Sequence, residues 1–543
     1  MNLLWKNFKG IRKLNSINSD SEFGADIAHG IRLSKEKSGQ YRSIRSSGWY
    51  DVFTESTEDV IRLFSANFSG APASEYLVAF TKTNSAINVW AIYDSTRNTV
   101  KTQIATFPLV SDVTDVCMVQ WGDRLGMVVA FDQSYLGFVY YSADAVIGGT
   151  QMGTSGFYYR TIDLSGVSSP LTNVSRVKPY GSRLAVNGVT TYANNAREKI
   201  YGVWFSEAGN PLNFAEDPMS NASETSAFYV ETAEYVNQIE VYHGLTAFCR
   251  NSSYNITGTS QSDYRCLPLT AKGVFGNATY TMNGQCAYVD SWNNNIFSLR
   301  DNIDGTIGFN DAIGNDIQDY LFDVTDVTVN SIGRRVRITK DSGQSLIYDV
   351  DIGEWTEEQL PENSRVVTFL NQEFVCFGGT DVLTILENWK VGAIQLPNDD
   401  GYYSHYRTNL MWLDSQSSVK SHLYPFAVIL EPQTSNDFFI KFTTDRGDVI
   451  QGRVTKAGFS NVATYSNDDT VPVDGSQFVD DDNDLSGRVF FSMNQTELLV
   501  TVDRPPFWRY LQIDIYTTSP DQQFNISGIE AKNTVITDEM LEY

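Results

Sequence analysis

Short apolar runs separated by turn residues dominate this chain. Between about residues 50 and 390 the pattern repeats as an apolar strand, a Gly or Asn turn and a second strand that ends in a polar corner. Clear units are Tyr76–Thr81 with Ile87–Asp94, and Ser345–Asp349 with a strand that resumes at Trp355. The repeat length of roughly 40 to 50 residues is typical of four-stranded propeller blades. The pattern predicts an all-β fold with a β-propeller of about six or seven blades, and a stack of β-sandwiches is the alternative.

Two strand ends carry the same dipeptide before a turn, Tyr93-Asp94 and Tyr348-Asp349. An Asp at this position can accept hydrogen bonds from the amides of the turn that follows. We therefore expect both pairs to end a strand in the outer hairpin of a blade.

The segment Asn310–Leu321 interrupts the strand pattern. Ile313, Ile317 and Leu321 follow one another at spacings of four, which indicates a short amphipathic helix between blades.

A second region begins near Leu396, where the strands become longer and more widely spaced. Trp508–Tyr516 alternates cleanly and predicts one long strand with one buried face. The expected organisation is an N-terminal arm at residues 1–50, a β-propeller at 51–396 and a β-sandwich-like domain at 397–543.

Charge is distributed unevenly along the 543 residues. The net charge is −25, yet residues 1–50 hold nine Lys or Arg and four Asp or Glu. The arm is therefore basic and the body strongly acidic, which argues against stable nucleic-acid binding but not against DNA sliding past. The arm is interpreted either as a segment that crosses the protein's own surface or as a tether to an oppositely charged neighbour.

Candidate chemistry is sparse. The five cysteines and four histidines show no metal-ligand spacing, and no phosphate-binding loop, Rossmann fingerprint or nucleophile elbow occurs. Cys117, Cys249 and Cys376 lie in apolar runs and are expected to be buried thiols rather than a disulfide framework. No catalytic, cofactor or metal residue is nominated, and the chain is expected not to be an enzyme.

The acidic loop at Asp480–Asp484 has carboxylates at alternate positions, as calcium loops do. Leu485 stands where the turning glycine of such a loop belongs, so we interpret it as a solvated loop. Apolar runs are too short to span a membrane, and the N-terminus lacks the apolar segment of a signal peptide, so neither membrane insertion nor export is expected.

The stretch Val203–Phe214, VWFSEAGNPLNF, joins a packed strand to a polar, proline-containing corner. It resembles the Ser, Asn-Pro and Asn-Phe corner of tail nozzle proteins of short-tailed bacteriophages, also called packaged-DNA stabilisation or tail tubular B proteins. Ile239–Phe248 with Tyr254–Gly258, and Trp508–Ile513 with Phe524–Ile529, resemble later parts of the same family. Phe8-Lys9-Gly10-Ile11 matches its glycine-rich opening only loosely.

The resemblance implies a structural protein of the virion tail, assembled in the host cytoplasm. It implies a homo-hexameric ring below the portal and adaptor, in contact with needle or fibre proteins, through which DNA passes without sequence-specific binding. Ser206, Asn210 and Pro211 are the residues expected at a subunit interface or blade-edge corner. The alternative is a glycan-binding or glycan-cleaving propeller of the tail, which would need paired carboxylates or a concave aromatic site. A bacterial surface propeller is a third interpretation, and it would require an export signal.

Overall fold

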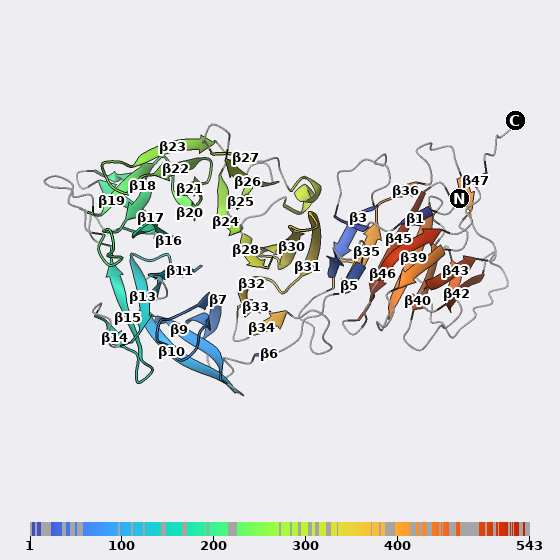
Figure 1. Ribbon diagram of the computed structural model, residues 1–543, viewed down its shortest axis with the longest axis horizontal. Coiled ribbons are helices and arrows are strands. Elements are labelled where there is room, and N and C mark those ends of the chain that lie inside the picture. Colours follow the sequence, from blue (N-terminus) through green and yellow to red (C-terminus); the bar gives the residue numbers. More distant parts are fainter. Residues whose placement is uncertain are drawn as a thin grey trace.

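The computed structural model has two strand-rich lobes (Figure 1). It describes residues 3–5, 8–11, 23–34, 40–43, 49–50, 58–95, 98–109, 112–113, 115–122, 125–142, 148–164, 171–192, 195–214, 225–270, 273–282, 285–290, 295–301, 307–309, 314–321, 327–333, 335–370, 372–378, 382–385, 397–412, 420–422, 426–430, 437–444, 447, 449–454, 463–466, 488–494, 497–502, 507–508, 510–519, 522, 524, 526–531 and 536–537. Within these ranges no helix is long and apolar enough to cross a membrane.

Among the described residues, seven antiparallel sheets follow one another along the chain, and their first strands surround a common centre (Figure 1). The first four sheets are β7 (Asp59–Ala66), β8 (Tyr76–Lys82), β9 (Ala86–Ser95) and β10 (Asn98–Pro108); β11 (Cys117–Trp121), β12 (Gly126–Ala130), β13 (Tyr135–Tyr141), β15 (Phe157–Asp163) and β14 (Thr150–Gln151); β16 (Val177–Tyr180), β17 (Arg183–Tyr192), β18 (Asn195–Phe205) and β19 (Phe228–Thr232); and β20 (Val236–Val241), β21 (Leu245–Cys249), β22 (Ser253–Thr257) and β23 (Arg265–Thr270). The other three are β24 (Val274–Met282), β25 (Gln285–Asp290), β26 (Asn295–Asp301) and β27 (Ile307–Phe309); β28 (Val327–Ile332), β29 (Arg335–Lys340), β30 (Gln344–Asp349) and β31 (Glu354–Gln359); and β32 (Arg365–Phe369), β33 (Gln372–Cys376), β34 (Val382–Ile385) and β6 (Trp49–Tyr50).

The last sheet is completed by a strand from the start of the chain. Val382 and Leu383 of β34 pair with Tyr50 and Trp49 of β6, and β32 lies against β7 of the first sheet. The series of sheets therefore closes on itself, which is consistent with a β-propeller. The predicted all-β fold class is confirmed.

The repeat is less regular than the sequence pattern predicts. Successive first strands begin between 38 residues (Val236 to Val274) and 60 residues (Cys117 to Val177) apart. The predicted spacing of roughly 40 to 50 residues was too narrow because strands as well as loops differ in length. The strands β7 to β10 are 7–11 residues long, whereas β20 to β23 are 5–6 residues long.

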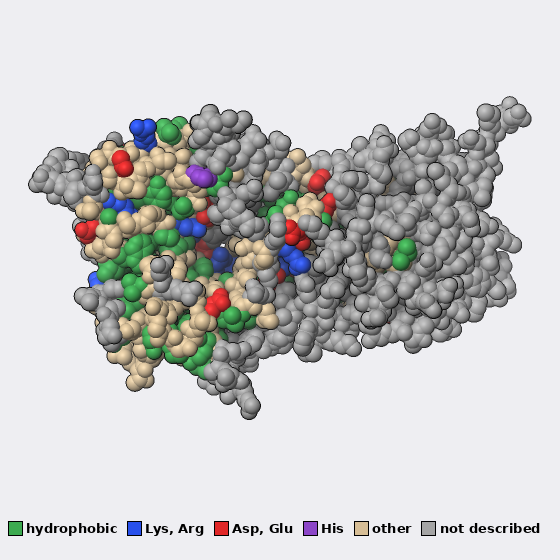
Figure 2. Space-filling view, in the orientation of Figure 1, with side chains coloured by type: hydrophobic (Ala, Val, Ile, Leu, Met, Phe, Trp, Pro, Cys, Tyr) green, Lys and Arg blue, Asp and Glu red, His purple; other side chains and the backbone are tan. Residues whose placement is uncertain are grey.

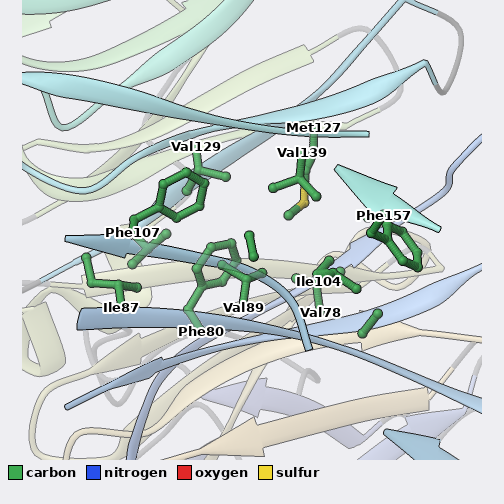
Figure 3. Packing of buried hydrophobic residues seen from close by; sticks show 14 of the residues in the cluster. Val78, Phe80, Ile87, Val89, Ile104, Phe107, Met127, Val129, Val139 and Phe157 are labelled. Atoms are coloured by element: carbon green, nitrogen blue, oxygen red, sulfur yellow. The ribbon is translucent and has the colours of Figure 1, made fainter. Parts of the chain in front are cut away.

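Neighbouring sheets pack through aromatic and branched side chains. Phe80 of the first sheet is fully buried, with its ring centroid 5.7 Å from that of Phe64 and 6.3 Å from that of Phe131 in the next sheet. Figure 3 shows Phe80, Phe107 and Val129 within this cluster. Gly137 makes room for it, since a Cβ there would lie 2.7 Å from the Phe107 ring. The spaces between sheets are thus filled as a hydrophobic core.

Two local predictions can be compared directly with the structure. Asp349 ends β30 and accepts hydrogen bonds from the amides of Asp351 (3.0 Å) and Ile352 (3.2 Å), as expected for a blade's outer hairpin. The predicted helix is a 3₁₀ helix, η1 (Asn315–Leu321), that buries Ile317 and Leu321, while residues 310–313 lie outside the described part of the chain.

The second lobe consists of two linked groups of strands. One contains β3 (Phe23–His29), β35 (Ser404–Thr408), β36 (Met411–Trp412), β45 (Tyr510–Thr517), β39 (Phe438–Thr444), β40 (Val449–Val454) and β41 (Ala463–Ser466). The other contains β1 (Leu3–Trp5), β46 (Ile526–Ala531), β38 (Phe426–Leu430), β43 (Glu497–Val502) and β42 (Arg488–Asn494). The remaining strands are β2 (Phe8–Ile11), β4 (Ile31–Ser34) with β5 (Gln40–Ser43), and β37 (Lys420–His422) with β44 (Phe507–Trp508) and β47 (Ile536–Thr537).

The N-terminal arm, interpreted from the sequence either as a segment that crosses the protein's own surface or as a tether to a neighbour, contributes strands to both lobes. Its strand β3 pairs with β35 of the C-terminal lobe and touches β31 of the propeller, and β6 completes the last propeller sheet. Strand edges need partners for their backbone groups. The sequence does not reveal these strand pairings, because each short run of mixed polarity is too brief to be identified as a strand by itself.

Most of the predicted strand Trp508–Tyr516 is β45, but Trp508 belongs to β44 and Arg509 lies outside the described residues. Both faces of β45 are largely covered. Ile513 and Ile515 lie in the lobe's core, and Asp514 and Tyr516 on the other face are also buried. The expectation of one buried face was wrong because His405 and Arg407 of β35 bind Asp514 from the polar side.

Truncation of a core side chain tests the inter-sheet packing. Phe80→Ala should lower the free energy of unfolding by about 3–5 kcal/mol, because it leaves a cavity between two sheets. Leu370→Ala, at a position 56% exposed, should change it by no more than about 0.5 kcal/mol. Chemical denaturation measures both, and equal effects would contradict the packing described.

Candidate functional site

The Val203–Phe214 corner begins where β18 ends, and its first polar residue is inaccessible. Ser206 is 0% exposed; its hydroxyl accepts a hydrogen bond from the amide of Leu184 (2.9 Å) and lies 3.2 Å from the Glu207 carbonyl, to which it donates. The Ser206 amide donates to the carbonyl of Leu184 at 2.9 Å. Ser206 therefore extends the pairing of β17 with β18 and is not available as a nucleophile.

A carboxylate organises the next part of the corner. One oxygen of Glu207, Oε2, accepts hydrogen bonds from the side-chain amides of Asn210 and Asn213, each at 3.0 Å. The Asn210 amide donates to the Glu207 carbonyl (3.1 Å), and Asn210 Oδ1 accepts from the amide of Leu212 (3.2 Å). Both asparagines of the motif thus stabilise one tight turn around Glu207, and Pro211 is buried within it.

Gly209 lies at the exposed tip of the corner. Its φ of +75° is in the left-handed region, and its amide donates to the Ser182 carbonyl at 2.7 Å. The left-handed backbone, rather than crowding, explains the glycine, because a Cβ would meet no atom within 4 Å.

Arg183 joins the corner to the next sheet. Its Nε donates to the Thr259 carbonyl (2.7 Å), and its Nη1 lies 2.6 Å from the Ser206 carbonyl and 2.7 Å from that of Ser226. Arg183 is 2% exposed, and burial lowers the pKa of its guanidinium below the usual value. A guanidinium has more N–H donors than a lysine ammonium and holds them in a fixed planar fork, which suits several carbonyls at once.

Aromatic rings continue this connection to the surface. Phe205 stacks on Phe228 with centroids 4.6 Å apart, and Phe228 stacks on Tyr264 at 5.7 Å. The Arg183 guanidinium lies over the Phe228 ring at 5.2 Å. Tyr264 is 36% exposed, so the column runs from the core to the rim near the corner.

The three nominated residues, Ser206, Asn210 and Pro211, do lie together in this corner. Glu207, Asn213 and Arg183 were missed, although Glu207 and Asn213 stand inside the singled-out stretch. The sequence signal for Glu207 was a Glu shortly before an Asn-Pro turn. No sequence signal marked Arg183, because its acceptors come from distant parts of the chain. The arrangement supports rigid presentation of a surface turn and offers no nucleophile.

A second polar cluster surrounds Glu357 where β31 meets the N-terminal strands. His29 Nδ1 lies 4.0 Å from Glu357 Oε1, and Gln344 donates to Glu357 Oε2 at 3.2 Å. The Lys340 ammonium donates to Gln344 at 2.7 Å. Burial lowers the pKa of Lys340 to about 8, against the opposing charge of Glu357, and burial raises the pKa of Tyr320. Groups with perturbed pKa values occur in active sites and also in structural networks. Here the groups contact one another where the two lobes meet.

In the described part of the chain no three His, Cys, Asp or Glu side chains are placed to hold a metal ion, and Asp480–Asp484 lies outside it. Cys249 and Cys376 are buried free thiols and Cys117 is half-buried. Burial raises the pKa of Cys249 and that of Cys376 to about 12, so neither is a ready nucleophile.

Charged groups of both signs lie close together among the sheets. Asp115 approaches Arg176 at 3.3 Å and Arg62 at 3.9 Å, linking segments at the starts of three sheets. Figure 2 shows acidic and basic side chains near the centre of the propeller lobe. The described charges where these three sheets begin are therefore of both signs.

No protein-family model matches the chain, and no curated protein is similar to it. Solved structures with similar folds include the CNH domain of AfRom2 (12% identity, 64% of this chain and 100% of that chain, TM-score 0.36). Others are YCF48 bound to D1 peptide (10%, 64% and 100%, 0.35) and BBS1N in complex with ARL6DN, soaked with lead (10%, 65% and 98%, 0.37). Similarities with such TM-scores support no statement about binding or activity.

Replacing Arg183 tests the corner's support. Arg183→Met should lower the free energy of unfolding by about 3 kcal/mol or more, because several carbonyls lose a buried donor. Arg453→Met is the matched control: this arginine side chain is 41% exposed and pairs with Asp437, so about 1 kcal/mol or less is expected. Chemical denaturation of both variants decides, and an Arg183 effect no larger than the control would contradict the assignment.

Lys340 should give the protein a specific pH dependence. Its pKa is about 8 when folded against 10.5 ordinarily, so the unfolded chain binds more protons between these values. The free energy of unfolding should consequently rise with pH from about 8 towards 10 through this group. Lys340→Met should remove that part of the slope, and Lys199→Met, at an exposed position, should not. Denaturation at several pH values measures this dependence. If the free energy of unfolding rises equally with pH in wild type and in Lys340→Met, the prediction is wrong.

Proposed function

We propose that this chain is a structural subunit of a bacteriophage tail nozzle. In this proposal the described sheets form a seven-bladed propeller and residues 397–543, joined by N-terminal strands, form a β-sandwich-like lobe. Six subunits form a ring below the portal and adaptor, contact needle or fibre proteins, and enclose the channel through which the genome is retained and ejected. The subunit is assembled in the host cytoplasm and acts in the virion without catalysing a reaction.

The observation that carries the proposal is the build of the Val203–Phe214 corner. Its Ser, Asn-Pro and Asn-Phe positions carry the resemblance to nozzle proteins, and each makes a defined structural contact. Ser206 is buried, while Gly209 is exposed at the tip. Such a turn suits a fixed contact surface better than a catalytic loop.

Charge supports the same role. A body with a large excess of Asp and Glu would repel phosphates and let a duplex slide without binding tightly. A ring made by one heterologous interface repeated around an axis closes without forming fibres. These features favour a conduit over a nucleic-acid reader.

Electron microscopy and mass photometry of the recombinant protein test the proposal. Wild type should form six-membered rings, and Asn210→Ala should leave folded monomers because the turn around Glu207 loses two hydrogen bonds. Ser85→Ala, in the exposed turn between β8 and β9, should still assemble.

The rival function gives a different result. A discrete wild-type monomer that binds saccharide would contradict the nozzle and favour the glycan-binding propeller. If Asn210→Ala assembles like wild type, the corner is not part of the subunit interface.

A further inference from the structure

A tight turn at residues 398–402, just before β35, is closed around one asparagine. Asn398 Oδ1 accepts hydrogen bonds from the backbone amides of Asp400 (3.1 Å) and Tyr402 (3.0 Å). The Asn398 backbone amide donates to the Tyr402 carbonyl at 2.9 Å, and its carbonyl accepts from the Gly401 amide at 2.8 Å. Asparagine favours such turns because its side-chain oxygen can bond to nearby backbone amides. These bonds fix the orientation of the Asn398 side chain.

The amide nitrogen of this side chain meets a buried histidine. Asn398 Nδ2 lies 3.1 Å from His405 Nδ1, and His405 is 0% exposed. Because Oδ1 is bound to the turn, Nδ2 is the donor in this contact, and His405 Nδ1 is an acceptor without a proton. The other ring nitrogen, Nε2, lies 2.8 Å from Asp514 Oδ1 and carries the proton that it donates. The contacts therefore assign a neutral His405 ring with its proton on Nε2.

A carboxylate lies close to the same ring nitrogen. Asp400 Oδ2 is 3.8 Å from His405 Nδ1, which is too far for a hydrogen bond. A second proton on the ring would place an N–H at Nδ1, opposite the N–H donors of Asn398. Two donors cannot bond to each other, whereas the Asp400 carboxylate is a charged acceptor for an imidazolium. Protonation would therefore exchange Asn398 for Asp400 as the partner of Nδ1.

Charged groups of both signs surround the ring. Asp514 and Asp400 favour a second proton on it, and Arg407 opposes one. Arg407 Nε lies 2.7 Å from Asp514, and its Nη2 lies 3.5 Å from Asp400. The other titratable groups that face this cluster are Tyr402 in the turn, Tyr516 and His29 opposite His405 on β45 and β3, Lys441 opposite Asp514 on β39, and Asp26, which acts on Arg407. Carboxylates are thus present for an imidazolium, and the hydrogen bond from Asn398 is what stabilises the neutral ring.

We propose that His405 and Asn398 form a pH-sensitive switch at the start of the C-terminal lobe. At neutral pH the Asn398 side chain binds both the turn amides and the His405 ring. When His405 takes up a second proton, Asp400 replaces Asn398 at Nδ1, and the turn at residues 398–402 rearranges. The inference stands on these contacts alone and does not rest on the nozzle function.

Nitrogen NMR of the full chain, which has four histidines, tests the switch. The His405 ring is identified as the signal that is absent from His405→Gln. In wild type at neutral pH this ring should carry a proton on Nε2 only. On acidification Nδ1 should gain a proton, and the backbone amide signals of Asp400 and Tyr402 should shift with the same midpoint, because both amides bind Asn398.

Two substitutions should move that midpoint in opposite directions. Asn398→Asp keeps an oxygen for the turn amides and offers the imidazolium a carboxylate, so the midpoint should rise by about one pH unit or more. Asp400→Asn removes a carboxylate near Nδ1, so the midpoint should fall. The matched control is Asn363→Asp, in an exposed turn of the propeller lobe, which should leave the His405 midpoint unchanged.

Several results would overturn the switch. They are a proton on Nδ1 at neutral pH in wild type, a ring that gains no second proton before the protein unfolds, and protonation of His405 without a change in the Asp400 and Tyr402 amides. A shift in Asn398→Asp no larger than in Asn363→Asp would also refute it. If Asn398→Asp does not fold, Asp400→Asn decides, and an unchanged or higher midpoint in that variant contradicts the proposal.

Discussion

Closure of the ring of sheets is the constraint on which the rest of the molecule depends. Each sheet is stable only when both of its faces are covered, so the last sheet must meet the first. The pairing of β34 with β6 achieves this with backbone groups from opposite ends of the propeller's sequence. The same N-terminal region then supplies β3, which joins the propeller to the second lobe. The described strands β3 and β6 of the N-terminal arm therefore connect parts of the protein that are far apart in sequence.

Buried charges reinforce contacts between sheets. Arg337 of β29 donates to Glu358 of its own sheet at 2.6 Å and to Glu373 of the next sheet at 2.7 Å, with all three side chains at most 5% exposed. Removing one member of such a group would leave a buried charge without its partner, which is costly. These networks specify which sheets face each other, whereas the apolar clusters supply most of the favourable burial.

Carboxylates organise both the Val203–Phe214 corner and the contact of the N-terminal strands with β31. In the corner, Glu207 accepts hydrogen bonds from side-chain amides and Arg183 donates to backbone carbonyls of several loops, so that an exposed turn is held rigidly. Where the N-terminal strands meet β31, Glu354 accepts a hydrogen bond from the Gly10 amide, and Glu357 lies 4.0 Å from His29.

By itself the sequence determined the all-β class, the repeat of apolar strands with polar turns, and the stretch that forms the corner. These are local properties: strand runs such as Tyr76–Thr81 and the turn geometry required by Gly209 and Pro211 are encoded within a few residues. It also identified the Asp349 turn, because the carboxylate and its amides are neighbours in the chain.

Only the tertiary structure decided which distant strands pair. The place of β6 in the last sheet, the position of β3 between the lobes, and the acceptors of Arg183 depend on contacts between residues far apart in sequence. The polar face of β45 was likewise covered by β35, against the simple alternation of its side chains. Short strands carry too little local information to specify their partners, because pairing depends on which backbone edges and apolar faces meet in the whole fold.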